Sequence, residues 1–156
     1  MEETKEQPDS EIIDFGFDVT EADVARPLLK TATLDAEIAF VRQVETQEKK
    51  LKQILVGYRL KEPATAIDGK LINPGFIITQ RILNEPTGGY TEEMRQDNLK
   101  RVHFAAAGPG KVNTKAWLDK PVRIRVTFRD EHTDKNGVDR PASNDVTGVY
   151  PMPKAA

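Results

Sequence analysis

The most regular pattern in the chain is an alternation of apolar and polar residues over positions 122–129. The apolar positions are Val122, Ile124, Val126 and Phe128, and the polar positions between them are Arg123, Arg125, Thr127 and Arg129. A period of two residues is that of a β-strand with one buried face and one exposed face. On such a strand, residues two apart on the same face are separated by about 6.6–6.8 Å. The chain therefore has to build a sheet that presents a row of arginines on its outer face.

Five strands and one helix are expected in total. The strands are predicted at residues 33–44, 54–60, 76–83, 122–129 and 145–150. The alternation of the first strand slips near Val41, as it does at a β-bulge. The helix is predicted to begin after Thr91, a good N-cap followed by two glutamates, and to end near Ala107, before Gly108. The order is therefore three strands, one helix and two strands.

This β-β-β-α-β-β order is that of the oligonucleotide/oligosaccharide-binding (OB) fold, a small and partly open five-stranded barrel. A β-sandwich or another α+β domain would need more strands than the sequence shows. The sequence therefore predicts a mainly β domain with one helix, an OB-fold-like barrel over residues 26–153. OB domains bind their ligands on the face of the second and third strands and with the loops that join strands 1–2 and 4–5.

Net charge divides the chain into two parts. Residues 1–25, here called the acidic arm, contain nine acidic residues and one basic residue, a net charge of −8. Residues 26–156 contain 22 basic and 16 acidic residues, a net charge of +6. The arm has no periodic apolar pattern, so we expect it to be disordered or loosely docked. Its residues Ile13, Asp14, Phe15, Phe17 and Asp18 combine apolar and acidic side chains, which suits docking in a cationic groove of this chain or of a partner.

The cationic body has the side chains that a single-stranded nucleic acid requires, namely positive charge along the phosphates and flat groups for the bases. The charged candidates are Arg59, Lys61, Arg81, Arg123, Arg125 and Arg129 on or beside the strands, Lys49, Lys50 and Lys52 at the loop between strands 1 and 2, and Lys135 and Arg140 in the loop between strands 4 and 5. The candidates for base stacking are Tyr58, Tyr90, Trp117 and Tyr150, and of these Tyr58 and Trp117 also fit core positions. The arginine row equally fits a solvated face paired with acids such as Glu37.

Several stretches resemble a family of phage-encoded proteins that are associated with replication and recombination and regarded as OB-type binders of single-stranded DNA. The matching stretches are residues 75–78, 98–101, 104–108, 117–126 and 144–151. The resemblance covers residues 30–153 and implies binding of single-stranded DNA without sequence specificity, in phage replication or recombination. Residues 152–156 lack the acidic tip that ends many such binders. The acidic arm would take the place of this missing tip, either as a competitor for the binding groove or as a segment that docks on a partner.

Catalysis, cofactor binding and metal binding are not expected. The chain has no cysteine, and of its two histidines His103 lies on the apolar face of the predicted helix. His132 lies in an acidic loop that lacks the glycine and glutamate positions of a calcium-binding loop. Neither a phosphate-binding glycine-rich loop nor a nucleophile-elbow motif is present in the sequence. The expected protein is a binding protein and not an enzyme.

Membrane partners are not expected either, because no apolar run approaches the roughly 18 residues needed to span a bilayer. An acidic N-terminal stretch is unlike a secretory signal. The expected location is the host cytoplasm, and the expected partners are single-stranded DNA, replication or recombination proteins and further copies of the chain. The alternative is a phage virion protein, such as a capsid-decoration or assembly protein, whose arm tethers it to a neighbouring subunit.

Overall fold

The computed structural model describes residues 12–13, 16, 26–47 and 49–153 of the chain. The long strands are β1 (Ala32–Glu45), β2 (Lys52–Leu60), β5 (Ile77–Leu83), β6 (Pro121–Arg129) and β9 (Ser143–Pro151). Two short hairpins pair β3 (Ala64–Thr65) with β4 (Leu71–Ile72), and β7 (His132–Thr133) with β8 (Asp139–Arg140). The helix α2 (Glu92–Ala107) and the short 3-10 turn η1 (Thr114–Ala116) lie between β5 and β6 in the chain. The predicted mainly β fold with a single α-helix in this part of the chain is confirmed.

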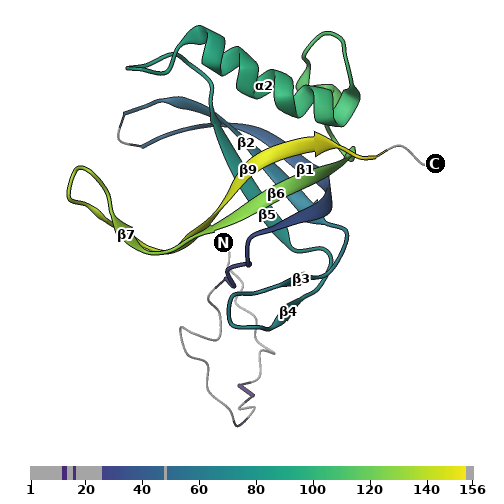
Figure 1. The fold of residues 1–156 in the computed structure, drawn as a ribbon, viewed down its shortest axis with the longest axis vertical. Helices are drawn as coiled ribbons and strands as arrows, with labels where there is room; N and C mark the ends of the chain where they lie inside the picture. The colour runs from purple at the N-terminus through teal and green to yellow at the C-terminus, as the bar shows by residue number, and fades with distance from the viewer. Residues whose placement is uncertain (1–11, 14–15, 17–25, 48, 154–156) are drawn as a thin grey trace, which may run out of the picture.

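The long strands form one antiparallel sheet in the order β5-β2-β1-β6-β9. Figure 1 shows this sheet curving around a common interior, with α2 lying across one of its ends. The sheet is not closed into a barrel, since within the described residues β5 pairs only with β2 and β9 only with β6. The expectation of a barrel is therefore corrected to an open five-stranded sheet.

Strand β1 curves sharply, which allows it to pair with two neighbours. It pairs with β6 over residues 32–37 and with β2 over residues 36–45, and a bulge lies between Ile38 and Phe40. Strand β6 begins at Pro121, opposite Glu37, so from Ile38 onward β1 bonds with the turn that precedes β6. Asp119 N donates to Ile38 O, and Ile38 N donates to Lys120 O. The bulge thus lies before the predicted slip at Val41. It is the point where β1 stops pairing with β6 and bonds with the turn that precedes β6.

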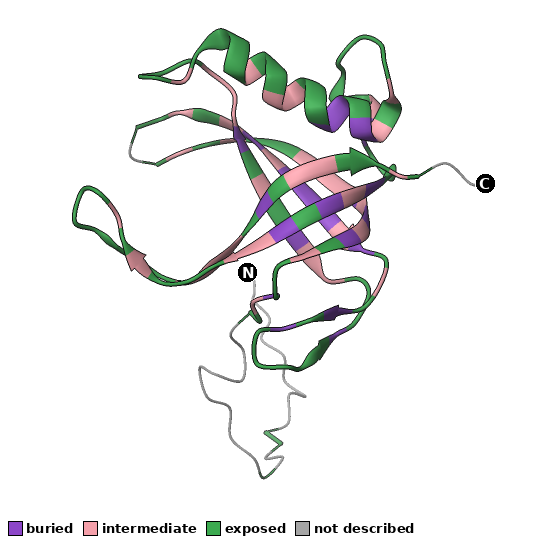
Figure 2. Ribbon diagram, in the orientation of Figure 1, coloured by how far each residue is buried: buried purple, intermediate pink, exposed green. Residues whose placement is uncertain are grey.

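The core lies between the concave face of the sheet and α2 (Figure 2). Tyr58 and Trp117 are both completely buried in it, although both were candidates for base stacking. The hydroxyl of Tyr58 donates to Gln80 Oε1 at 2.7 Å, and burial raises the pKa of this phenol. Trp117 Nε1 donates to Nδ1 of the buried His103 at 3.0 Å. Neither ring has a face left for a base, so these two assignments to the binding surface are wrong.

The helix has the boundaries that its end signals predict. The Thr91 side chain accepts a hydrogen bond from Met94 N at 3.1 Å, which satisfies one of the free donors of the first turn. Gly108 ends the helix with a φ of 78° and donates its N–H to Phe104 O. Between these ends, the face that carries Val102 and His103 is buried against the sheet.

Candidate nucleic-acid interface

The convex face of β1, β2 and β5 carries a compact group of side chains, here called the Phe40 patch. It consists of Phe40, Arg42, Leu55, Gly57, Thr79 and Arg81. The register places these residues in two neighbouring rows across the three strands, Phe40–Gly57–Thr79 and Arg42–Leu55–Arg81. The residues that alternate with them on β2 and β5, such as Val56 and Ile82, are buried on the other face. The patch therefore faces away from the core.

The Phe40 ring lies flat on the backbone of Gly57. A Cβ atom at Gly57 would lie 2.3 Å from Cε2 and 2.5 Å from Cζ of this ring, distances that real side chains do not tolerate. On the ring's other side, the guanidinium carbon of the exposed Arg42 lies 4.3 Å from the ring centroid, within the range of a cation–π interaction. Glycine, phenylalanine and arginine therefore form a layered stack whose outermost layer is a guanidinium plane. Such planes, like aromatic rings, stack on unpaired bases.

Two arginines of the patch have no acidic partner among the described residues. Arg42 lies over Phe40, and Arg81 donates from Nη1 to Gln53 Oε1 at 3.1 Å. Both side chains are exposed. A neutral partner leaves the guanidinium charge uncompensated, so both arginines are available to phosphate.

The loop between β1 and β2 extends this positive charge beyond the end of the two strands. Lys49, Lys50 and Lys52 are exposed, and Lys52 pairs in register with Glu45 at the last position of β1. Lys50 has a φ of 56°, and its N–H donates to Thr46 O in the turn. Exposed Lys61 follows directly after the other end of β2. These predicted lysines lie at both ends of the strands that carry the Phe40 patch.

The remaining strand arginines differ in how far acids neutralise them. Arg59 lies 3.3 Å from Glu37, and Arg123 lies 3.0 Å from Asp35. Half-exposed surface pairs like these contribute only about 0–1 kcal/mol each to folding, but a phosphate must displace the carboxylate to use the arginine. Arg125 donates to the Thr33 hydroxyl, and Arg129 has no acidic partner in the described part of the chain. The predicted row of arginines is thus real on the outer face, with a neutralised stretch that separates β6 from the Phe40 patch.

The β7–β8 hairpin holds the two cations predicted in the loop between strands 4 and 5. Asp134 Oδ1 accepts hydrogen bonds from Val138 N and Asn136 N, and its Oδ2 accepts one from Arg140 Nε at 3.0 Å. The Val138 N–H and the other two donors keep the pKa of Asp134 below its usual range. Arg140 is therefore engaged within the hairpin, whereas Lys135 is exposed at its tip. In Figure 1, this hairpin and the β1–β2 hairpin project toward the same side of the molecule.

Most of the predicted docking segment of the arm lies outside the described residues. This holds for Asp14, Phe15, Phe17 and Asp18. Ile13 is described and is 61% exposed. Where the arm docks therefore stays a prediction.

Three residues at the centre of the Phe40 patch, Phe40, Arg42 and Gly57, are not among the residues that the sequence predicts for binding. The sequence signal that points to the patch is Gly57, because a glycine inside a strand pattern often marks a close approach of another group to the backbone. Which group approaches it depends on the register between β1 and β2, and the bulge after Ile38 sets that register. The slip in the alternation of β1 was visible, but its position was not.

No helix in residues 26–47 and 49–153 is both long enough and apolar enough to cross a bilayer. Within the same ranges, histidine, aspartate and glutamate side chains form no group of three or more that could bind a metal ion.

Comparison of the sequence with known protein families finds no match, and comparison with characterised proteins finds no relative. The function has to be inferred from the surface itself.

Proposed function

We propose that this chain is an OB-type protein that binds single-stranded nucleic acid without sequence specificity. The strand order β5-β2-β1-β6-β9, with the helix inserted between the third and fourth long strands, supports the OB assignment. The two hairpins that project to one side occupy the positions of the loops with which OB domains bind ligands. The resemblance to phage replication and recombination proteins makes single-stranded DNA the proposed ligand.

The observation that carries this proposal is the stack of Arg42 on Phe40 on Gly57. Stacking of a base on an aromatic or guanidinium plane contributes about 1–3 kcal/mol per base and does not depend on the identity of the base. The stack lies on β1 and β2, beside Arg81 on β5, so one base and its neighbouring phosphates can be bound together. A surface of this kind favours single strands, because the bases of a duplex are already stacked on one another.

The acidic arm is proposed to act as a competitor in this function. The arm has a net charge of −8 and residues 26–156 have a net charge of +6, so the arm and a nucleic acid are attracted to the same cationic side chains. A competitor of this kind lowers the affinity for short ligands most, because a longer strand makes more phosphate contacts at once. The arm could equally dock on a replication or recombination partner, and either role leaves the Phe40 patch as the nucleic-acid surface.

A pair of substitutions in the full-length protein tests the proposal. We expect Arg42→Gln together with Arg81→Gln to weaken binding of an oligo-dT strand at least tenfold at low salt. We also expect the slope of log affinity against log salt to become shallower by about 1.4, since each single-strand phosphate contact contributes about 0.7. Fluorescence anisotropy with a labelled oligonucleotide over a salt series measures both quantities.

The matched control is Lys70→Gln together with Lys115→Gln, which removes the same charge from exposed positions outside the patch. Unchanged affinity and slope in the Arg42/Arg81 variant, or an equal loss in the control, would contradict the proposed surface. Absence of any binding by the unmodified protein at low salt would contradict nucleic-acid binding itself. That result would favour the alternative function, a structural protein of a phage virion.

A further inference from the structure

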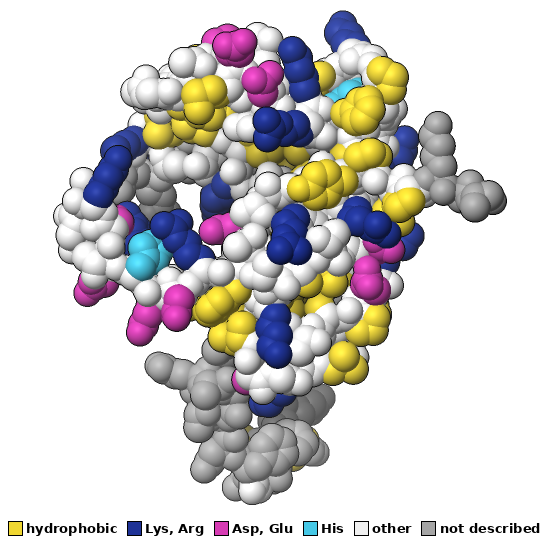
Figure 3. All heavy atoms as spheres, viewed as in Figure 1, with side chains coloured by type: hydrophobic (Ala, Val, Ile, Leu, Met, Phe, Trp, Pro, Cys, Tyr) yellow, Lys and Arg dark blue, Asp and Glu magenta, His cyan; other side chains and the backbone are white. Residues whose placement is uncertain are grey.

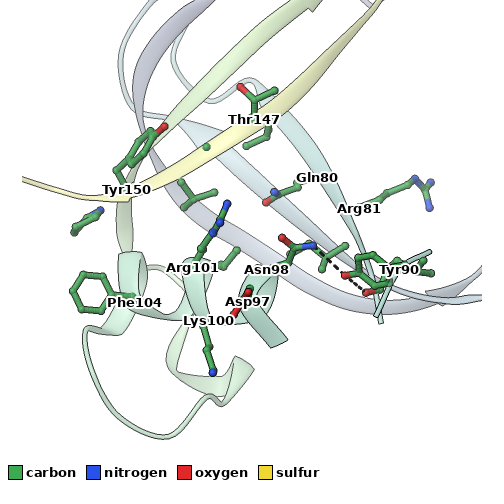
Figure 4. A pocket seen from close by; sticks show the side chains of 17 residues that line it. Gln80, Arg81, Tyr90, Asp97, Asn98, Lys100, Arg101, Phe104, Thr147 and Tyr150 are labelled. Carbon is green, nitrogen blue, oxygen red and sulfur yellow. Dashed lines mark hydrogen bonds between the residues drawn. The ribbon is translucent and has the colours of Figure 1, made fainter. Parts of the chain in front are cut away.

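A groove, here called the edge groove, adjoins the Phe40 patch at the edge strand β5. It has a volume of about 1040 Å³ and is lined by residues 80–83 of β5, residues 146–151 of β9 and one side of α2. Figure 4 shows these lining side chains from close by. Arg81 belongs to the Phe40 patch and also lines the edge groove. The two surfaces are therefore continuous at this arginine.

The edge groove is a trough on the surface of the molecule and not a gap in the sheet. Cα atoms of β5 and β9 approach within 8 Å of one another, and α2 packs against both strands. The lining residues Ile82, Val102 and Val146 are buried and form an apolar floor. Pockets for single small molecules have volumes of about 300–1,000 Å³, so the edge groove has room for a segment of a longer ligand.

Positive charge predominates on the walls of the edge groove. Arg81, Lys100 and Arg101 line it, against the single carboxylate of Asp97. In Figure 4, Arg101 extends from α2 toward β9, whereas Lys100 points away from the strands. Arg101 is exposed and forms no ion pair with any acid in the described part of the chain. Its guanidinium group is therefore available to a phosphate, as those of Arg42 and Arg81 are.

Tyr150 repeats on β9 the arrangement that Phe40 forms on Gly57. Gly148 and Tyr150 are two residues apart on β9 and share its outer face. A Cβ atom at Gly148 would lie 2.3 Å from the hydroxyl oxygen and 2.6 Å from Cζ of Tyr150, so the ring lies over the glycine. The residue is nevertheless 48% exposed, which leaves part of the ring open to solvent. Tyr150 therefore offers a second surface on which a base can stack.

Further aromatic side chains lie at both ends of the edge groove. Phe104, in the last turn of α2, is 54% exposed near Tyr150. At the other end, the hydroxyl of Tyr90 donates to Leu83 O at 2.9 Å and accepts a hydrogen bond from Asn98 Nδ2 at 3.0 Å. Figure 3 shows cationic side chains with hydrophobic ones between them over α2 and the front of the sheet. Cations interleaved with rings are typical of a surface that binds single strands of any sequence.

We infer that a single strand bound on the Phe40 patch continues over the edge of β5 into the edge groove, where Arg101 binds a phosphate and Tyr150 stacks on a base. This inference rests on the proposed function and adds a second stacking site to it. An acidic peptide would be attracted to the same cations. The continuity at Arg81, with a ring on a glycine on either side of it, favours a nucleic acid as the ligand.

The same path leads from the edge groove to the arginines of β6. Arg125 lies opposite Gly148 in the register between β6 and β9, and it is exposed. It donates to the Thr33 hydroxyl and has no acidic partner among the described residues, whereas Arg123 is paired with Asp35. A strand that stacks on Tyr150 therefore reaches an uncompensated cation on the neighbouring strand. The path thus connects the Phe40 patch to the arginine row of β6 around the open edge of the sheet.

Substitutions in the full-length protein test this inference with an oligo-dT strand of about 15 nucleotides, near the upper limit of an OB-fold site. We expect Arg101→Gln together with Tyr150→Ala to weaken binding at least fivefold at low salt, because a base loses its stacking partner. The slope of log affinity against log salt should become shallower by about 0.7, for one lost phosphate contact. Fluorescence anisotropy over a salt series measures both quantities.

The matched control is Arg101→Lys together with Tyr150→Phe, which keeps the charge and the ring and should bind within twofold of the wild type. Lys115→Gln, at an exposed position in η1 outside the edge groove, should leave affinity and slope unchanged. Arg101→Gln alone changes only an exposed helix position and should still lower the slope by about 0.7. This single variant separates the loss of the phosphate contact from any effect of Tyr150→Ala on folding.

A comparison with Arg42→Gln, which affects the Phe40 patch alone, separates this inference from the proposed function. Unchanged binding by the groove variants, with weaker binding by Arg42→Gln, would overturn the inference, leave the proposed function intact and make an acidic peptide the better candidate ligand. Titration at protein concentrations above Kd should give one strand per protein. Two strands per wild-type protein, reduced to one by the groove variants, would show two separate sites and overturn the continuous path.

Discussion

Gly57 and Phe40 show how one missing side chain shapes a surface. Phe40 follows the bulge in β1, and its ring reaches across to β2, where only a glycine leaves room for it. With the ring held against the backbone, Arg42 can spread its guanidinium group over the other ring face. The flat stack therefore depends on a glycine that itself makes no contact with a ligand.

Substitution of Gly57 by alanine tests this dependence. The new methyl group would lie within 2.3–2.6 Å of three atoms of the Phe40 ring, so the ring must leave the sheet. We expect the free energy of unfolding to fall by about 1–3 kcal/mol, as in other overpacked sites, and oligo-dT affinity to fall as well. Urea unfolding of Gly57→Ala measures the first effect.

The control for this prediction is the same substitution in a Phe40→Ala background. With the ring absent, Gly57→Ala has nothing to displace and should cost much less stability than it does in the wild type. An equal loss of stability in both backgrounds would show that the glycine is required for a reason other than Phe40.

Tyr58 and Trp117 show the limit of reading binding residues from amino-acid type. Tyr58 shares the alternation of Ile54 and Val56, and that phase is a correct guide to its burial. Trp117 follows a short turn with no period of its own, so only the tertiary structure places it beside His103. Aromatic side chains bury a large apolar area, so in a small domain such a residue stabilises the fold most when it lies in the core.

At the scale of elements, local signals predicted the helix and the long strands well. The cap at Thr91 and the stop at Gly108 depend on neighbouring residues alone, and so does the two-residue period of β6. The bulge and the lack of pairing between β5 and β9 depend on which strands pair, over sequence separations of tens of residues. Alternation within one strand carries no information about such pairing, so the sequence could not predict the position of the bulge or the absence of closure.

The β7–β8 hairpin combines a turn that the sequence predicts with a charge arrangement that it does not. The pair Asn136–Gly137 is a typical hairpin turn, and Gly137 has a φ of 79°. Asp134 then accepts hydrogen bonds from the turn backbone and from Arg140. The hairpin is therefore stabilised by a carboxylate that must be ionised.

The ionisation of Asp134 makes a prediction about pH. Because the folded hairpin holds the pKa of Asp134 below its usual value near 4, the carboxylate contributes stability above that value and loses it as the pH falls through the lower, folded pKa. We expect the carboxyl carbon of Asp134 to titrate below the ordinary aspartate range in an NMR pH series. In Arg140→Gln its midpoint should move upward, while a midpoint at the ordinary aspartate value in the wild type would contradict the observed contacts.

At the scale of the whole molecule, a near-neutral chain is built from two strongly charged parts. The body presents the Phe40 patch on its convex face, and the acidic arm carries the opposite charge. Nucleic acid and the arm are therefore expected to compete for the same cations, and this competition should weaken as salt screens both interactions.

The most direct test of the binding surface is an NMR titration of the full-length, isotope-labelled protein with an oligo-dT strand at low salt. The largest amide shift changes are predicted at residues of the Phe40 patch, with smaller changes at Lys49, Lys50 and Lys52. Raising the salt concentration should reverse these changes in proportion to the loss of affinity. Absence of shift changes, or changes confined to the β3–β4 hairpin or the exposed side of α2, would contradict the assignment of the convex face as the nucleic-acid interface.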